Sequence, residues 1–330
     1  MTTIDIHSHF FPRAWPDLAA RFGTPDWPSI RHTGPDQAVI MLGGREFRHI
    51  RAACWNAAAR IEDMDRDGVD MQIMCATPVL FAYDRPPAQA LECARIFNDA
   101  ALEICSHDGR RLKALCQVPL QDTDLACAEL ERALSGGHIG VQIGNHVGEK
   151  DLDDPGIMTF LQHCASLDAP VFVHPWDMLA PERMSRYMLS WLVGMPAETQ
   201  LSILSLILSG ALERLPRSLR ICFAHGGGSF VFLLGRADNA WQQRDVVREH
   251  CPNPPSSYVD RFHVDGAVFD DAALALLIRI MGEDQVMLGT DYPFPLGEQR
   301  AGALIGNHTG ISDAARTKLL SGNARRFFRV

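Results

Sequence analysis

Short apolar runs alternate with longer amphipathic segments along the whole chain. The apolar runs that predict strands are Thr3–Ile6, Met71–Ala76, Lys113–Val118, Gly140–Ile143, Val171–His174, Arg220–Ala224, Phe262–Val264 and Val286–Gly289. The segments with apolar residues at helical spacing are Asn56–Arg66, Ala88–Ser106, Asp124–Ser135, Pro155–Leu167, Ala197–Arg214, Ser229–Arg244 and Asp271–Met281. Because strands that alternate with helices of this length form βαβ units, the pattern predicts a parallel sheet. Eight such strands favour a closed (β/α)₈ TIM barrel over an open sheet.

Two stretches fall outside this alternation. Residues 11–54, which follow the first strand, are rich in proline and glycine and include MLGGREFRHI, a candidate hairpin. Residues 312–330 predict one or two closing helices. We therefore expect residues 1–330 to form a single α/β barrel domain with an insertion at 11–54.

The composition, with 47% hydrophobic and 22% charged residues, is that of an ordinary globular protein. The net charge of −9 argues against a nucleic-acid partner but leaves an anionic substrate open, because local arginines decide that. The nine cysteines include no CxxC pair, so we expect reduced thiols. The most apolar stretch, Leu201–Leu212, contains three serines and predicts a buried helix. With no basic leader at the N-terminus, we expect a cytoplasmic protein that does not bind membranes.

The first predicted strand ends in the letters DIHSH, which carry His7 and His9. Residues two apart in a strand face the same way, so these two imidazoles point together. Barrel enzymes place their sites at the C-terminal ends of the strands, and paired imidazoles there are good zinc ligands.

Three further predicted strands end in candidate ligands. His174 follows VFV, His225 follows ICFA, and Asp291 follows MLGT. Because these ends meet at the mouth of a barrel, we expect the three side chains to converge with His7 and His9. The set could supply three neutral imidazoles and a carboxylate to one Zn²⁺, with one histidine left for acid–base work.

Longer blocks of the sequence carry a family resemblance. They are DIHSHFFPR, CATPV, QVPLQD, HPWDM, MPAETQLSILSLILSGALERLP, CFAHGGGSF, LLGRADNAW and GTDYPFPLGEQ. With these blocks the chain resembles the amidohydrolase superfamily, in its branch of metal-dependent decarboxylases. The likeness covers nearly the whole chain, and the blocks HPWDM and GTDYPFPLGEQ are the specific ones.

The resemblance implies a role for each strand-end residue. It implies that one Zn²⁺ per subunit is bound by His7, His9, His174 and Asp291. His225 would be the acid–base residue that activates the metal-bound water.

The resemblance also implies how the substrate is bound. Arg48 and Arg236 would hold the carboxylates of a small anionic substrate in forked, charge-assisted bonds. In the family the second arginine reaches in from the neighbouring subunit, so the resemblance implies a homodimer with Arg236 working across the interface. Trp176 and Phe294 closely follow metal ligands, and we expect them to wall the pocket.

The implied reaction is the non-oxidative decarboxylation of 2-amino-3-carboxymuconate-6-semialdehyde, in either tryptophan breakdown (the kynurenine pathway) or nitroaromatic breakdown. The predicted fourth strand carries Gln142 where dinuclear relatives carry a carbamylated lysine, and Lys150 lies well beyond the strand. This absence predicts a site for a single metal ion. We expect zinc, although three histidines and an aspartate would also take cobalt or iron.

Three other functions stay open from the sequence. A related barrel could decarboxylate a hydroxybenzoate, or hydrolyse a lactone or an amide without releasing CO₂. An inactive metal-binding scaffold would keep the metal ligands and show no turnover. Asp265, on the predicted seventh strand, receives no role.

Overall fold

The computed structural model describes residues 2–330 and contains two parallel sheets that together form a ring. The first sheet has the order β1 (Ile4–Phe10), β5 (Met71–Ala76) and β6 (Leu112–Ala114). The second has the order β7 (Val141–Gly144), β10 (Val171–His174), β11 (Ile221–Phe223), β12 (His263–Asp265) and β13 (Val286–Met287). All eight strands predicted from the apolar runs are present, and the predicted bounds of β5 and β10 are those observed.

Backbone contacts on both sides join the two sheets into a closed barrel. A parallel bridge between Cys116 and Val141 connects β6 to β7. On the other side, the amide of Ile6 donates to the carbonyl of Leu288 at 3.0 Å, and the amide of Asp291 donates to the carbonyl of His7 at 2.9 Å. Because no edge remains between β13 and β1, the predicted (β/α)₈ barrel is confirmed.

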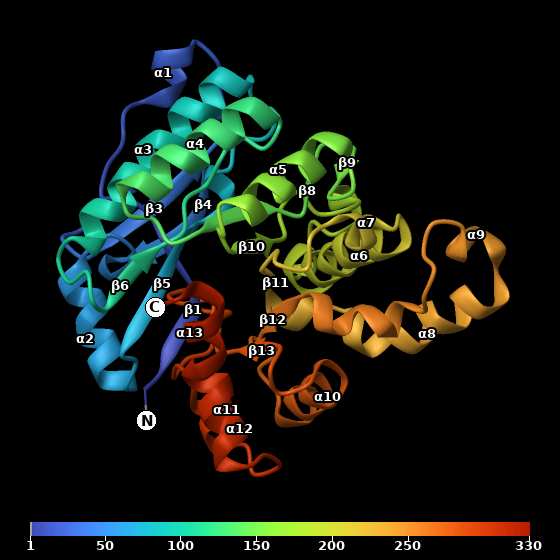
Figure 1. Cartoon of the computed structure of the whole chain (residues 1–330). Helices are drawn as coiled ribbons and strands as arrows, with labels where there is room; N and C mark the ends of the chain where they lie inside the picture. Colours follow the sequence, from blue (N-terminus) through green and yellow to red (C-terminus); the bar gives the residue numbers. More distant parts are fainter. Residues whose placement is uncertain (1) are drawn as a thin grey trace.

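Helices cover the outside of the barrel (Figure 1). The long ones are α2 (Ala57–Asp67), α3 (Pro87–Cys105), α4 (Thr123–Gly136), α5 (Pro155–Ser166), α6 (Met195–Leu208), α8 (Phe230–Gln243) and α10 (Asp271–Met281). The capping residues of α2 set the bounds of that helix. The Asn56 side chain accepts a hydrogen bond from the amide of Ala58 at the start of α2, and Gly68, with φ 75°, ends the helix. In Figure 1, α8 and the short α9 (Asp245–Arg248) extend away from the barrel as an arm.

The expectation of a single helix over Ala197–Arg214 is wrong in two respects. The helix begins earlier, in a π-helical turn over Ser190–Gly194, and it is interrupted at Gly210 before the short α7 (Ala211–Arg214). Gly210 adopts a left-handed φ of 71°, and a Cβ there would collide with the backbone of His250. The sequence pattern could not show this contact, because it joins segments far apart in the chain.

Within residues 2–330, one helix, Ser190–Leu208, is long and apolar enough to cross a membrane. Its residues Ile203, Leu206 and Ile207 are buried in the main core beneath the barrel wall. That packing is typical of a core helix in a barrel.

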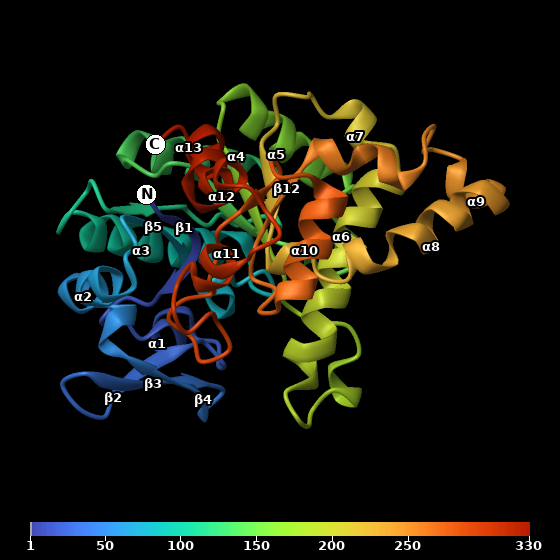
Figure 2. The same cartoon turned by 90° about the horizontal axis from the view of Figure 1, so that it is seen from below.

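Residues after β1 form a small antiparallel sheet beside the mouth of the barrel, seen below it in Figure 2. It follows α1 (Leu18–Phe22) and consists of β2 (Ser29–His32), β3 (Gln37–Leu42) and β4 (Arg45–Arg51). The turn between β3 and β4 is made by Gly43 and Gly44, both with positive φ, as a tight hairpin requires.

The chain ends in the short helices α11 (Ala303–Asn307), α12 (Asp313–Thr317) and α13 (Asn323–Phe328), and α13 covers the opposite end of the barrel. Phe327 and Phe328 share a buried cluster with Ile4, Ile6 and Phe172 from the barrel interior. The N-terminal ends of the strands are thus covered, and the C-terminal ends are left for a functional site.

Candidate metal centre and active site

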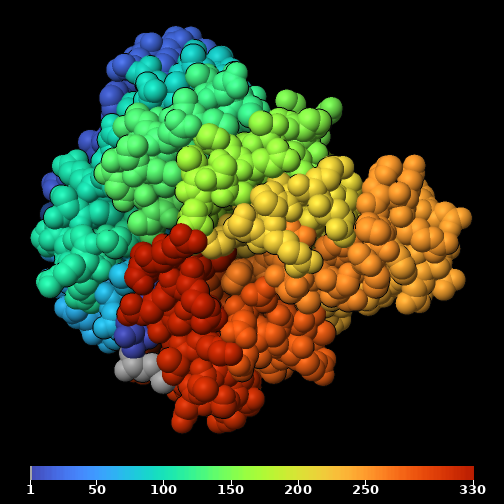
Figure 3. All heavy atoms as spheres, in the orientation of Figure 1, coloured from blue at the N-terminus to red at the C-terminus, as the bar shows by residue number. Residues whose placement is uncertain are grey.

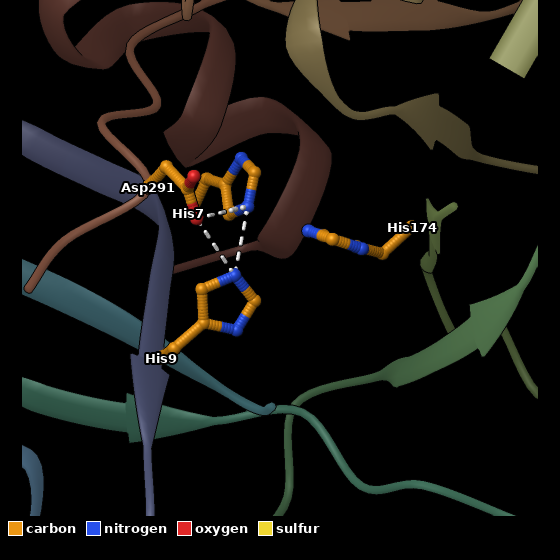
Figure 4. A group of neighbouring side chains, drawn as sticks. All are labelled: His7, His9, His174 and Asp291. Atoms are coloured by element: carbon orange, nitrogen blue, oxygen red, sulfur yellow. Dashed lines mark hydrogen bonds and ion pairs between the residues drawn. The ribbon is translucent and has the colours of Figure 1, made fainter. Parts of the chain in front are cut away.

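Four side chains from three parts of the barrel point toward one another at its C-terminal end (Figure 4). His7 and His9 come from β1, His174 is the last residue of β10, and Asp291 follows β13. One ligand atom from each lies within 4.8 Å of all the others. The structure therefore brings together the four residues for which the sequence predicted metal binding.

The nitrogens of these imidazoles face inward. His7 Nε2 and His9 Nε2 lie 3.1 Å apart, and Asp291 Oδ1 lies 3.0 Å from His9 Nε2 and 3.6 Å from His7 Nε2. His174 Nδ1 donates to the carbonyl of Pro175 at 3.0 Å, which leaves Nε2 as the atom available to a ligand. That Nε2 is buried and has no hydrogen-bond partner anywhere in residues 2–330.

The charges of His9, His174 and Asp291 suit a divalent cation, whereas the pKa of His7 is raised, because Asp265, Asp291 and Asp5 outweigh its burial. Burial lowers the pKa of His9 to about 4, and burial together with the neighbouring imidazoles holds the pKa of His174 well below its usual range. Burial alone would raise the pKa of Asp291, but the hydrogen bond from His9 and the nearby imidazoles outweigh it, so its pKa is lowered. Neutral imidazoles and an ionised carboxylate are the forms that bind metal. The residues present therefore fit one divalent ion.

His225 lies beside this cluster and is not one of its four members. It follows β11, its ring centre is 5.1 Å from that of His7 and 5.0 Å from that of His174, and its Nε2 is 3.9 Å from Asp291 Oδ2. Burial lowers the pKa of His225, so the ring is neutral at pH 7 and able to accept a proton. Its backbone has a positive φ of 56°, an uncommon conformation for a residue with a side chain.

A cavity of about 500 Å³ opens above the cluster. Its floor includes His9, His174 and Asp291, and most of its wall is apolar. The wall residues are Phe47, Arg48, His49, Thr77, Pro78, Trp176, Met188, Trp191, Met195, Phe294, Pro295 and Leu296. A pocket of this size and lining is typical of a site for a small organic molecule.

Arg48 reaches this cavity because of an irregularity in β4. Ile40 pairs with Arg48 and Met41 pairs with Glu46, so Phe47 is an extra residue in the strand. Adjacent residues of a regular strand face opposite sides, but the bulge lets both Phe47 and Arg48 line the cavity.

The Arg48 guanidinium is mostly buried, and this favours the binding of an anionic ligand. Burial lowers its pKa, although the charge of Asp291 opposes this effect. Within the described chain it forms no hydrogen bond or ion pair, and its guanidinium carbon lies 4.0 Å from the centre of the Phe294 ring. A buried cation without a counter-charge is costly, so the pocket is suited to a ligand that brings a carboxylate.

The other predicted substrate residues divide into two groups. Trp176 and Phe294 line the cavity, and the Phe294 ring also stacks on His9 with the ring centres 5.3 Å apart. Arg236 is exposed on α8 and is not among the residues that line the cavity of its own chain. The structure therefore does not bring Arg236 to the site of the same subunit.

Sequence reasoning missed several residues of the site. Phe47, Met188 and Trp191 line the cavity, but they lie in the insertion and in the segment before α6, where neither strand ends nor spacing gave a signal. Asp265 was noticed without a role, and the structure places its carboxylate 2.6 Å from His7 Nδ1. Its position at the end of β12 was the only available signal.

Comparisons with known proteins identify the family of this chain. Residues 4–330 match the family model described as Amidohydrolase. The chain is 43% identical, over 98% of its length and 90% of the relative's, to 2-amino-3-carboxymuconate-6-semialdehyde decarboxylase of Dictyostelium discoideum. It is 32% identical, over 97% of its length and 92% of the relative's, to the protein of the same name from Caenorhabditis elegans. The solved structure of a dihydroxybenzoic acid decarboxylase from a Polaromonas species, with bound manganese and an inhibitor, matches with a TM-score of 0.78 at 22% identity, covering 99% of this chain and 97% of that one.

Proposed function

The chain belongs to the amidohydrolase family, and from that membership we propose that it is a carboxy-lyase acting on 2-amino-3-carboxymuconate-6-semialdehyde. The products are CO₂ and 2-aminomuconate-6-semialdehyde. Two relatives that carry this name match nearly the full length of the chain, at 43% and 32% identity. The observation that carries the proposal is Arg48, a largely buried cation that forms no ion pair within residues 2–330 and lines a cavity whose floor includes the metal-cluster residues His9, His174 and Asp291.

The proposed cofactor is one Zn²⁺ per subunit, held by His7, His9, His174 and Asp291. Three imidazole nitrogens and one carboxylate oxygen form a donor set that zinc favours, and the same set also accepts cobalt, iron or manganese. When bound, the ion supplies Lewis acidity at the floor of the cavity.

The side chains of the protein bind the substrate, exclude water and transfer the proton. Arg48 binds a substrate carboxylate in a forked, charge-assisted bond and so fixes the orientation of the molecule. Trp176 and Phe294 provide flat apolar surfaces for a conjugated substrate and exclude water. The bond to the leaving carboxylate breaks with its electron pair remaining on carbon. His225 accepts a proton from solvent water at Nε2 and donates it to that carbon, which replaces the C–C bond to CO₂ by a C–H bond.

A homodimer is part of this proposal. Arg236 lies on α8, whose arm projects from the body of the molecule in Figure 3. Phe232, one turn earlier on the same helix, is 80% exposed, so this face of the arm combines an apolar ring with a cation. We propose that a second copy of the chain packs on this face. Arg236 then enters the site of that copy and binds a second carboxylate of its substrate.

A panel of three substrates tests the reaction class. The zinc-loaded protein is given the semialdehyde, generated in situ by its upstream dioxygenase, and in parallel a dihydroxybenzoate and a lactone. The proposal requires CO₂ release from the semialdehyde above the rate of its spontaneous cyclisation. Release from the dihydroxybenzoate alone, or lactone opening without CO₂, would replace it with one of the alternative functions.

A further inference from the structure

The single carboxylate of Asp265 contacts both the metal-cluster residue His7 and the turn that carries His225. The residue is fully buried at the end of β12. Its Oδ2 lies 2.6 Å from Nδ1 of His7, and its Oδ1 accepts hydrogen bonds from the amides of Gly226 at 2.9 Å and Ala267 at 3.1 Å. We propose that Asp265 is a positioning residue that orients the metal ligand His7 and the turn that carries His225.

The contact with His7 fixes which nitrogen faces the metal cluster. An ionised carboxylate can only accept hydrogen bonds, so His7 must carry its proton on Nδ1 and donate it to Asp265. The lone pair then lies on Nε2, the atom that faces His9 and Asp291. A partner of this kind orients the ring, selects the tautomer and makes the ligand more basic.

The other oxygen holds the turn after β11. His225 and Gly226 have positive φ values of 56° and 63°, and the amide of Gly226 points at Asp265 Oδ1. For His225 this backbone is strained, so it persists only where surrounding contacts impose it. The hydrogen bond from the next residue is one such contact, and its loss would free the His225 ring to move away from the cluster.

The neighbouring strand leaves room for this pair. A Cβ on Gly289, which follows β13, would lie 2.7 Å from Asp265 Cβ and 2.9 Å from His7 Cβ. Even the smallest side chain there would push the two apart. This constraint is independent of the hydrogen bonds, and it shows that the strand ends are shaped around the contact between His7 and Asp265.

Asp265→Asn separates the two roles. The amide oxygen can still accept from Gly226 and Ala267, but the NH₂ group then faces His7 Nδ1 and forces the His7 proton onto Nε2. We expect the Kd for zinc, measured by competition with a chelator, to rise about 10- to 100-fold. With saturating zinc, turnover should return to within about threefold of the wild type, because the His225 turn keeps its hydrogen bond.

Asp265→Ala removes both contacts. Zinc affinity should fall at least as far as in Asp265→Asn, and kcat at saturating zinc should stay about 10- to 100-fold below the wild type, because His225 is displaced. Recovery of full turnover by zinc-saturated Asp265→Ala would overturn the role toward His225.

Asp5→Asn is the matched control. Asp5 is an equally buried carboxylate on β1, and its partners within residues 2–330 are the His7 amide, Thr290 Oγ1 and Gln72 Nε2, with no imidazole nitrogen among them. This change should lower stability yet leave the Kd for zinc within about twofold, because the His7 ring is untouched. Equal losses of zinc affinity in Asp5→Asn and Asp265→Asn would make Asp265 merely structural.

A measurement on the wild-type holoenzyme covers the case in which the variants fail to fold. In the zinc-loaded protein, ¹⁵N NMR of the histidine rings should show His7 with a slowly exchanging proton on Nδ1. A proton on Nε2, or zinc binding by folded Asp265→Asn as tight as wild type, would overturn the proposal. The inference rests on the proposed metal site, but neither of these readouts needs turnover, so an error in the assigned substrate would leave them unchanged.

Discussion

The guanidinium carbon of Arg48 lies 4.0 Å from the centre of the Phe294 ring, and the same ring stacks on the metal-cluster residue His9 at 5.3 Å. One rigid aromatic side chain thus supports both the cation of the cavity and one of the proposed metal ligands. A cation over an aromatic ring is stabilised by the ring quadrupole. Phe294 therefore partly offsets the free-energy cost of burying the Arg48 guanidinium without an ion pair. The arrangement fixes the Arg48 guanidinium relative to the metal cluster, and we expect it to orient a substrate carboxylate there.

Arg48→Lys keeps the positive charge but removes the planar fork. We expect kcat/KM for the semialdehyde to fall about 10- to 100-fold, which is the range for losing hydrogen bonds to a charged group. Zinc content should not change, because Arg48 does not contact the proposed ligands through a polar atom. Arg45→Lys, an exposed change on the same strand, is the control and should leave kcat/KM unchanged. An Arg48→Lys enzyme with wild-type kcat/KM would remove Arg48 from the substrate site.

His225→Gln should keep its zinc and lose about 10²- to 10⁴-fold in kcat, because proton transfer is removed while the four ligands remain. Loss of the metal together with the activity would make His225 a ligand and contradict the assignment.

The pH dependence of the wild type tests the protonation state of His225. Burial lowers the pKa of His225 below its ordinary value of 6.5, and the neutral ring is the form that accepts a proton. The rate should therefore persist as pH falls through 6.5 and decline only at lower pH. A profile of kcat/KM against pH measures this limb, and a decline that begins above pH 7 would count against a neutral His225.

His146 is expected to make stability depend on pH. Its Nδ1 lies 2.8 Å from the carbonyl of Gly148 and its Nε2 lies 2.9 Å from the carbonyl of Asp177, so both nitrogens must donate and the ring must be charged. Burial opposes the charge, but these hydrogen bonds and the carboxylates of Glu198 and Asp177 outweigh it and raise the pKa above 6.5. A raised pKa means that the contribution is complete below pH 6.5 and is lost as pH rises through the folded-state value.

The measurement compares the free energy of unfolding of the wild type and His146→Gln at pH 6 and pH 9. The difference between them should be larger at pH 6. A His146→Gln penalty that is constant across this range would show that the ring is neutral in the native state.

Complementation tests whether Arg236 acts across an interface. Arg236→Ala and His225→Ala are each expected to be nearly inactive, and mixing them should restore up to about a quarter of the activity, because one mixed site in each heterodimer has both groups. Arg244→Ala, on the same arm, should stay active alone. Heterodimers that form without any recovery of activity would place Arg236 outside the neighbour's site.

Much of this site could be predicted from the sequence, because strand ends in a barrel converge whatever the loops do. The HxH spacing placed His7 and His9 on one face, and the apolar runs placed His174 and Asp291 at the same end of the barrel. The bulge at Phe47 could not be predicted, since it depends on how β4 pairs with β3. The contact between Asp265 and His7 joins residues 258 positions apart, and the break at Gly210 depends on the distant backbone of His250, so neither leaves a local pattern.

We propose that a single metal ion in this barrel supports decarboxylation of 2-amino-3-carboxymuconate-6-semialdehyde. The most direct test is a titration of metal-free protein with zinc, with CO₂ release from that substrate measured at each addition. We expect a linear rise that stops at about one zinc ion per subunit, since residues 2–330 contain one set of four side chains that could hold the ion. Release that is independent of added zinc in protein shown to be metal-free, or no release from fully loaded protein, would contradict it.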